Sequence, residues 1–245
     1  MSALLELRGL VAGYGDAPVV HGLDLRVDAG EVVALLGPNG AGKTATLLTV
    51  SGLLRPLGGS LTLFGERLGP PRGPRSAVGR RARAGLAHVS DDRSLFPGLT
   101  VAEHLTLAAP RSSRRTVLDA TWERFGELEA LRDRRAGVLS GGEQQLLAVA
   151  RAIAAGPRLL MVDELSLGLA PRIVARVLPV LRQLAAEGAG VLVVEQQVGA
   201  ALEVADRAVV LAGGRVARAG TATELAADRS VLAEDYLGPG PRTAP

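Results

Sequence analysis

A glycine-rich turn at residues 37–44 constrains this 245-residue chain more than any other part of its sequence. The turn reads Gly-Pro-Asn-Gly-Ala-Gly-Lys-Thr, and it lies between an apolar run and a helical pattern. A glycine, four residues and then Gly-Lys-Thr is the P-loop spacing, which is specific when a strand precedes it and a helix follows. Unpaired N–H groups and the positive dipole end of such a helix favour a polyphosphate. We therefore expect the turn to bind the phosphates of a nucleotide.

The side chains of the turn indicate how it would hold a nucleotide. Lys43 would place its ammonium on the β- and γ-phosphates, and the hydroxyl of Thr44 would ligate the Mg²⁺ that bridges them. Gly40 and Gly42 leave room for phosphate oxygens. Lys43 is the only lysine among 28 basic residues, which argues against an ordinary glycine-rich turn because a planar guanidinium cannot replace a compact point charge. The predicted nucleotide-binding residues of the turn are Gly37, Pro38, Asn39, Gly40, Ala41, Gly42, Lys43 and Thr44.

Composition limits the class of protein. A hydrophobic content of 47% is enough for the core of one large α/β domain or of two small domains. The formal net charge is only +3, so we expect no nucleic-acid partner. The absence of cysteine excludes disulfides and fits a reducing cytoplasm. No apolar run reaches the roughly 18 residues of a membrane span, so any role at a membrane needs a partner.

Two strands are expected ahead of the P-loop, at residues 4–14 and 19–27, as an antiparallel edge sheet. Tyr14 is one of only six aromatic residues and lies between glycines near the end of the first strand. An aromatic face ahead of a phosphate-binding loop is a candidate to stack on a nucleobase. The alternative is a tyrosine packed at a strand end.

An arginine cluster and a pair of carboxylates follow. We expect the cluster to form a solvated helix face. A short apolar strand then ends at Asp91 and Asp92, where Asp91 could reach a metal ion or orient water, although a capped turn fits the spacing nearly as well. The arginines of the cluster are Arg72, Arg75, Arg80, Arg81 and Arg83.

The segment Leu139-Ser140-Gly141-Gly142-Glu143 opens a predicted helix that runs to Ala155. Ser140 and Glu143 fit a capping box, which is a purely structural explanation of the pattern. Two glycines in a first turn are poor helix formers, since each costs roughly 1 kcal/mol relative to alanine inside a helix. We infer that another group approaches this backbone closely, and that the helix start is a second anion site.

Residues 158–164 predict a buried strand that ends in Asp163 and Glu164. If this strand is adjacent to the P-loop strand, Asp163 lies near Mg²⁺ and Glu164 polarises the attacking water. The alternative is a strand end with two solvated acids. Another core strand is expected at 190–197, and the last clear strand at 208–211. The tail at 238–245 is rich in glycine and proline and is predicted to be disordered.

The P-loop, residues 139–145 and residues 161–164 together resemble the ATP-binding cassette (ABC) ATPases, over residues 4–237. The resemblance implies a single α/β domain at residues 1–237, with a RecA-like P-loop ATPase core, an antiparallel β subdomain and a helical signature-motif subdomain at about 91–156. It implies ATP and Mg²⁺ as cofactors and Tyr14 as the residue that stacks on adenine. It also makes Ser140, Gly141 and Gly142 the signature that contacts the γ-phosphate held by a second subunit.

Residues 89–97, 163–171 and 194–196 are similar to one of the two ATPase subunits of branched-chain amino acid importers, whose pattern is close to VPEGR-x-x-FP, DEPSLGLAP and VEQN. Asp91 stands in place of the pattern's glutamate and is one methylene shorter, so its metal or water contact stays open. The ATPases of urea and short-amide importers are similar enough to leave the substrate open. The other departures from the pattern are Ser90, Asp92, Leu165 and Gln197.

Gln196 stands where most cassette ATPases carry a histidine that contacts the γ-phosphate, so we expect it to be catalytic together with Glu164. The implied partners are a paralogous cassette subunit, polytopic membrane permease subunits and, indirectly, a solute-binding protein. The implied location is the cytoplasmic face of the cell membrane. Two other classes compete with this hypothesis, namely a soluble cassette ATPase that acts on nucleic acid or ribosomes and a P-loop kinase. The signature segment has no use in a kinase.

Overall fold

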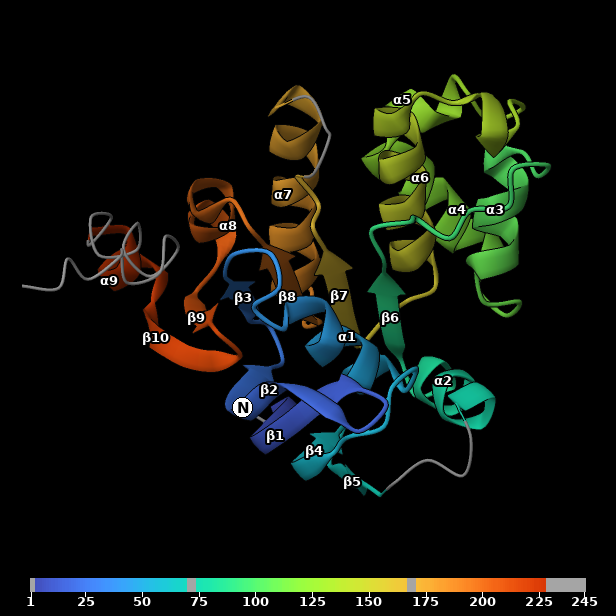
Figure 1. The fold of residues 1–245 in the computed structure, drawn as a ribbon. Helices are drawn as coiled ribbons and strands as arrows, with labels where there is room; N and C mark the ends of the chain where they lie inside the picture. The colour runs from blue at the N-terminus through green and yellow to red at the C-terminus, as the bar shows by residue number, and fades with distance from the viewer. Residues whose placement is uncertain (1–2, 70–73, 167–170, 228–245) are drawn as a thin grey trace, which may run out of the picture.

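A computed structural model describes residues 3–69, 74–166 and 171–227, and all structural statements refer to these ranges. The strands form two sheets that lie against each other through α1, Lys43–Ser51 (Figure 1). The smaller sheet is antiparallel, with strand order β2-β1-β4-β5. Its strands are β1 Ala3–Tyr14, β2 Ala17–Asp28, β4 Gly58–Leu63 and β5 Glu66–Leu68.

The larger sheet has the order β10-β9-β3-β8-β7-β6 and is parallel except at β10, which pairs antiparallel with β9. Every residue of β3, β7 and β8 is buried, as expected for parallel strands that are covered on both faces. Its strands are β3 Val32–Leu36, β6 Leu86–Val89, β7 Leu159–Asp163, β8 Gly190–Glu195, β9 Arg207–Ala212 and β10 Arg215–Thr221.

The order of this sheet corrects one expectation. The strand that carries Asp163 is not adjacent to the P-loop strand, because β8 lies between β7 and β3. A sequence cannot reveal this order, since all three strands are equally apolar. Strand β10 was also missed, because most of its residues are exposed and it shows no apolar pattern.

Four α-helices and the short 3₁₀ helix Ala136–Val138 lie between β6 and β7 in the chain, and the α-helices gather on one side of the molecule in Figure 1. The helical chain is interrupted at Phe125, since α4 ends at Arg124 and α5 begins at Gly126. The capping box predicted at Ser140 is confirmed, and Thr100 forms a second one with Glu103 at the start of α3. These helices are α3 Val101–Ala108, α4 Arg114–Arg124, α5 Gly126–Glu129 and α6 Gly141–Ala154.

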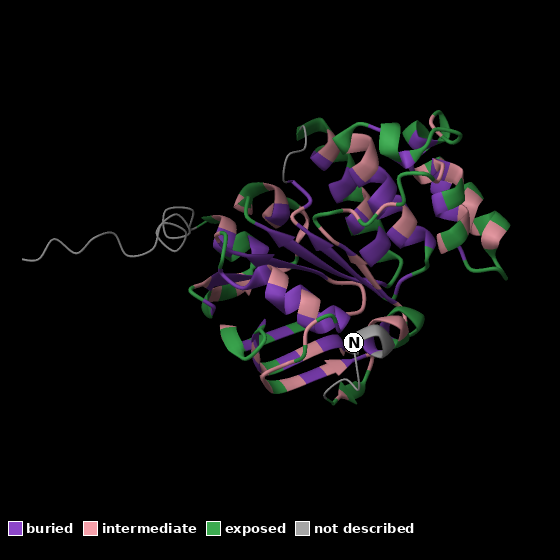
Figure 2. Ribbon diagram, turned by 45° about the vertical axis from the view of Figure 1, so that its right-hand side comes forward, coloured by how far each residue is buried: buried purple, intermediate pink, exposed green. Residues whose placement is uncertain are grey.

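The remaining helices surround the large sheet. Alternate residues of β8 divide between two core layers, because side chains alternate across a strand. Val191 and Val193 pack with α6 and α7, whereas Leu192 and Val194 pack with α1 and the antiparallel sheet. Figure 2 shows this buried layer running through the centre. These helices are α2 Pro74–Arg83, α7 Pro171–Ala186, α8 Val198–Val204 and α9 Ala222–Ala227.

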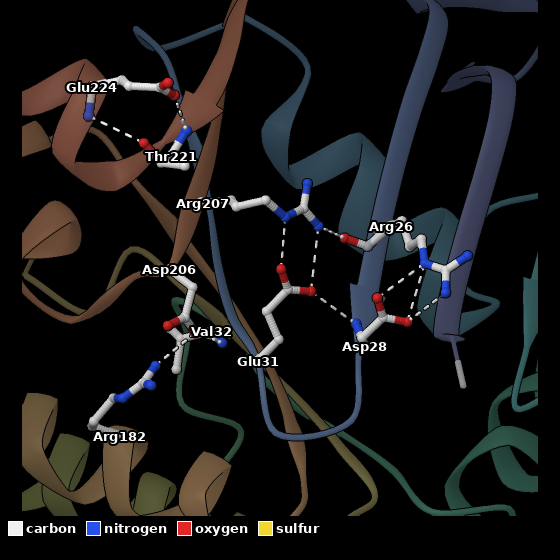
Figure 3. A network of polar contacts seen from close by, with 9 residues as sticks. All are labelled: Arg26, Asp28, Glu31, Val32, Arg182, Asp206, Arg207, Thr221 and Glu224. Atoms are coloured by element: carbon white, nitrogen blue, oxygen red, sulfur yellow. Dashed lines mark hydrogen bonds and ion pairs between the residues drawn. The ribbon is translucent and has the colours of Figure 1, made fainter. Parts of the chain in front are cut away.

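A polar network joins the two sheets at the amino ends of β3 and β9 (Figure 3). The Nε of Arg207 donates to Oε1 of Glu31 at 2.6 Å. Oδ2 of Asp206 accepts from Nη1 of Arg182 at 2.6 Å and from the backbone N–H of Val32 at 2.8 Å. The network therefore fixes the amino edge of the parallel sheet, opposite the carboxyl edge where β3 leads into the P-loop.

The arginine cluster on α2 is only partly the solvated face that its sequence predicts. Arg80 and Arg83 are exposed, but Arg81 is buried, with 3% of its surface exposed. Its Nη1 donates to the carbonyl oxygens of Thr49 and Val50, both at 2.6 Å. A cation at the C-terminal end of α1 is favoured by the helix dipole and adds a donor to its last carbonyls, of which that of Thr49 also accepts from the N–H of Gly52.

Several expectations concern residues outside the described ranges. These expectations concern Arg72, the side chain of Arg75, residues 167–170 of the 163–171 segment, and the tail at 238–245 that the sequence predicts to be disordered. Within the described ranges, no helix combines the length and the apolar character that a membrane crossing requires.

Candidate nucleotide-binding site

The P-loop connects the end of β3 to the start of α1 and depends on glycine for its shape. Gly40 and Gly42 have φ angles of 79° and 102°, in the left-handed region that favours glycine. A Cβ atom on Gly42 would lie 2.5 Å from Cγ2 of Val20, whereas a Cβ on Gly40 would meet nothing within 4 Å. Glycine is therefore required at 42 by the close approach of β2 as well as by backbone conformation.

Lys43 is buried with its ammonium over the turn. Its Nζ donates to the carbonyl oxygens of Gly37 at 2.8 Å and Pro38 at 3.1 Å, and it lies 3.6 Å from Oε1 of Glu164. The first turn of α1 contains no acidic residue, and Gly42 has no side chain to cap it. The ammonium and the positive end of the helix dipole therefore act on the same space, which favours an anion.

Thr44 and Asp163 form a pair of oxygen donors beside this space. The hydroxyl of Thr44 donates to Oδ2 of Asp163 at 3.1 Å. Oδ1 of Asp163 is buried and has no hydrogen-bond partner among the described residues. The pKa of Asp163 is raised to about 6, chiefly by burial, with the charges of Glu164 and Asp91 acting in the same direction and the Thr44 hydrogen bond opposing them. A buried carboxylate oxygen without a partner, next to a hydroxyl, fits a Mg²⁺ ion that keeps waters and phosphate oxygens as its other ligands.

Glu164 follows directly with an unusual backbone. Its φ angle is 44°, which is uncommon for a residue other than glycine and which costs of order 1–3 kcal/mol. Its backbone N–H donates to the carbonyl oxygen of Val194 at 2.9 Å. The strained conformation turns the side chain toward Lys43 at the end of β7.

These residues surround a cavity of about 240 Å³. Tyr14 lies at its edge with 53% of its surface exposed, so the ring is not packed away at the strand end. Val19 and Ala45 also line the cavity, but the sequence analysis did not predict them. No sequence pattern could have identified Val19, because its position depends on the pairing of β1 with β2. The predicted residues that the cavity brings together are Tyr14, Asn39, Gly40, Gly42, Lys43, Thr44 and Glu164.

The signature segment does not line this cavity. Ser140 and Gly142 border a separate hollow of about 730 Å³ beside α5 and α7. Oε2 of Glu143 accepts from the N–H of Ser140 at 2.7 Å, so the capping role of the segment is present. A Cβ on Gly142 would lie 3.2 Å from Cγ1 of Ile173, which gives packing as one reason for glycine there. A single chain therefore keeps the P-loop and the signature apart.

Asp91 and Gln196 are both exposed and lie outside the cavity lining. Oδ1 of Asp91 accepts from the N–H of Asp92 at 2.8 Å, which is a turn contact. Its charge nevertheless reaches Asp163, whose pKa it raises. Gln196 follows directly after Glu195, the last residue of β8.

The start of α1 concentrates positive charge beside the oxygen donors at the carboxyl edge of the parallel sheet. This arrangement suits a nucleoside triphosphate. The fold and the site together place the protein among the P-loop ATPases. The family model described as "ABC transporter" matches residues 20–166, more than half of the chain. The chain therefore belongs to the ABC transporter family, and it is an ATP-binding, ATP-hydrolysing subunit, as predicted.

Individual relatives are similar to this chain over nearly its whole length. The high-affinity branched-chain amino acid transport ATP-binding protein BraG of Pseudomonas aeruginosa is 38% identical over 228 residues, or 92% of this chain and 95% of BraG. The lipopolysaccharide export system ATP-binding protein LptB of Acidithiobacillus ferridurans is 35% identical and covers 97% and 98%. A solved structure of the ATP-binding subunit of an ABC transporter superposes with a TM-score of 0.81 at 31% identity, covering 96% and 98%. The predicted fold class is confirmed.

Proposed function

We propose that the chain is the ATPase subunit of an importer for branched-chain amino acids, working at the cytoplasmic face of the membrane with separate permease subunits. The observation that carries this proposal is the 38% identity to BraG over nearly the full length of both proteins. The 35% identity to LptB, which is named for an export system, supports an exporter as the alternative. ATPases of urea or short-amide importers and a soluble ABC ATPase acting on nucleic acid or ribosomes are further alternatives, and a net charge of +3 gives little support to the last.

The residues of the cavity would divide the chemistry among them. Lys43 and the first-turn N–H groups of α1 bind the phosphates, and Tyr14 stacks on the adenine. Thr44 and Asp163 hold Mg²⁺, and Asp91, whose charge acts on Asp163, contributes through a water. Bound Mg²⁺ supplies positive charge that neutralises the phosphate oxygens. Glu164, held beside Lys43, accepts the proton of the attacking water.

A second cassette would complete this site. Ser140 and Gly142 border a different hollow from the one that contains Lys43, so the signature of one chain is available to the nucleotide of another. We propose that ATP joins two such chains and that the partner is a paralogous cassette. A solute-binding protein would act only indirectly, through the permease. The division into a core and a helical unit at about 91–156 remains a prediction.

Reconstitution tests the proposal. The chain should copurify with a polytopic permease and a second cassette, and vesicles that contain this complex should take up leucine, isoleucine or valine when ATP is supplied on the cassette side. The matched control is the same complex carrying Lys43→Ala, which should not transport. Uptake of urea or acetamide in place of the amino acids would favour the small-amide alternative. Failure to copurify with any membrane protein would contradict a transport function.

A further inference from the structure

Glu195 is a buried carboxylate whose two oxygens both accept hydrogen bonds from a single residue. The backbone N–H of Ser166 donates to Oε1 at 2.8 Å, and the hydroxyl of Ser166 donates to Oε2 at 2.6 Å. Only 3% of Glu195 and 8% of Ser166 is exposed. A carboxylate at this depth is costly unless its oxygens are hydrogen-bonded, so the pair fixes the two segments against each other.

The two segments lie just after β7 and at the end of β8, at the carboxyl edge of the sheet where Glu164 lies. Ser166 lies two residues after Glu164, and Glu195 lies one residue after Val194, which accepts the backbone N–H of Glu164. The end of β8 therefore holds the chain at Glu164 and again just beyond it. Between these two anchors the backbone of Glu164 keeps its strained φ angle of 44°. Strain of this kind persists only where the surrounding contacts over-determine it.

Glu195 has no direct access to a nucleotide. It does not line the cavity that contains Lys43 and Glu164, and both of its oxygens are engaged by Ser166. An effect of Glu195 on hydrolysis must therefore pass through the position of another group.

We infer that Glu195 is a positioning residue for ATP hydrolysis, which holds Ser166 so that the strained backbone of Glu164 keeps its carboxylate beside Lys43 in the cavity. This inference rests on the proposed role of Glu164 as the base. Losing the second anchor lets the backbone of Glu164 relax toward negative φ and turns the carboxylate away from the attacking water. Binding of the phosphates depends on the P-loop and is unaffected.

The test uses the full-length chain with MgATP and compares Glu195→Ala, Glu195→Gln and Ser166→Ala. Glu195→Ala should lower kcat by at least about tenfold, the scale set by releasing a strained residue, with KM and the calorimetric ATP affinity nearly unchanged. Glu195→Gln should recover most of the rate, because its amide oxygen accepts from the Ser166 N–H and its NH₂ can donate to the hydroxyl oxygen. The double variant Glu195→Ala/Ser166→Ala should be no slower than Glu195→Ala, since both changes remove the same contact.

The control is Glu224→Ala on α9, which removes a similar contact, from the N–H of Thr221 to Oε2 of Glu224 at 2.9 Å, at an exposed site. It should leave kcat unchanged. If Glu195→Ala does not fold, the kcat of Ser166→Ala tests the inference instead, because this variant removes only a hydroxyl. Its kcat should also be lower than that of the parent. Parent-like kcat in folded Glu195→Ala or, where that variant does not fold, in Ser166→Ala would overturn the inference, and so would a Glu195→Gln variant as slow as Glu195→Ala. A parent-like rate in Glu164→Gln would instead overturn the assignment of the base, so the two failures are distinguishable.

Discussion

The hydroxyl of Thr44, in the first turn of α1, donates to Oδ2 of Asp163 at 3.1 Å across 119 residues of sequence, although β8 lies between β7 and β3, the strand that leads into α1. The contact is possible because parallel strands all end at one edge of the sheet, where α1 also begins. The same contact leaves Oδ1 of Asp163 without a partner among the described residues. Without a bound metal ion, this carboxylate is therefore a source of instability.

We predict that Asp163→Asn stabilises the nucleotide-free protein at pH 7. Burial raises the pKa of Asp163 from 3.8 to about 6, so its protonated form stabilises the folded state below pH 4 and this contribution is lost as pH rises through about 6. The shift corresponds to about 2–3 kcal/mol at pH 7. Urea unfolding at pH 7 and at pH 4 measures it, and the advantage of the variant should largely disappear at pH 4.

Asp206→Asn is the control, and its effect on the free energy of unfolding should have the opposite sign. The hydrogen bond from Arg182 is the main effect that lowers the pKa of Asp206, against the raising effect of burial. Its carboxylate therefore stabilises the fold above its unfolded pKa, and this contribution is lost as pH falls. Asp206→Asn should destabilise the protein at pH 7. Equal effects of the two substitutions would contradict the electrostatic explanation.

Lys43→Ala should abolish tight MgATP binding. The variant removes the ammonium that lies over the turn, and losing charge-assisted hydrogen bonds to phosphate should weaken binding by about a hundredfold or more. Tyr14→Ala should weaken adenine nucleotides but have less effect on inorganic polyphosphate, because it removes only a stacking face. Calorimetry with both ligands measures this. Unchanged ATP affinity in Lys43→Ala would refute the phosphate assignment.

Glu164→Gln should bind MgATP and fail to hydrolyse it. The amide keeps the size of the side chain but cannot accept a proton from water. The assembled cassette dimer should then persist in ATP, which gel filtration or light scattering can follow. Hydrolysis at the parent rate would require a different base.

Arg81→Met should destabilise the fold by about 1–3 kcal/mol. Methionine fills the space of the buried stem but removes the guanidinium donor from the carbonyl oxygens of Thr49 and Val50, of which Thr49 still accepts from the N–H of Gly52. The exposed neighbour provides the control, because Arg83→Met changes charge on the same helix without burying anything. Thermal unfolding of the two variants should differ, and equal melting temperatures would show that the buried guanidinium contributes nothing.

The sequence revealed the elements of this site better than their arrangement. The P-loop and the apolar strands before Asp163 and Gln196 were predictable, because fully buried parallel strands read as continuous apolar runs. The position of β8 between β3 and β7 was not, since sheet order depends on long-range packing. Burial of Arg81 was equally hidden, because nothing in an arginine run shows which residue faces a helix end.

Gln196 is a predicted catalytic residue that departs from the pattern of most cassette ATPases, although it matches the VEQN pattern of the branched-chain amino acid importers. It stands where the resemblance places a histidine, and it is exposed beside the buried Glu195. An imidazole can carry positive charge and exchange a proton, whereas glutamine is neutral at every working pH and can only donate through its amide. Losing one charge-assisted contact to the developing phosphoryl charge can cost a few kcal/mol, or roughly a hundredfold in rate.

That deficit favours a chain built to pair with a different cassette that has its own histidine. The purified chain alone should be a slow ATPase, and a paralogous cassette together with the permease subunits should stimulate it. Gln196→His should raise the rate of the isolated chain, because it restores a protonatable group at the position that the resemblance places beside the γ-phosphate, whereas Gln197→His, one residue further along, should not. Steady-state ATPase assays of the three proteins measure this. A fast and cooperative ATPase in the unpaired parent chain, unchanged by Gln196→His, would count decisively against the heterodimer.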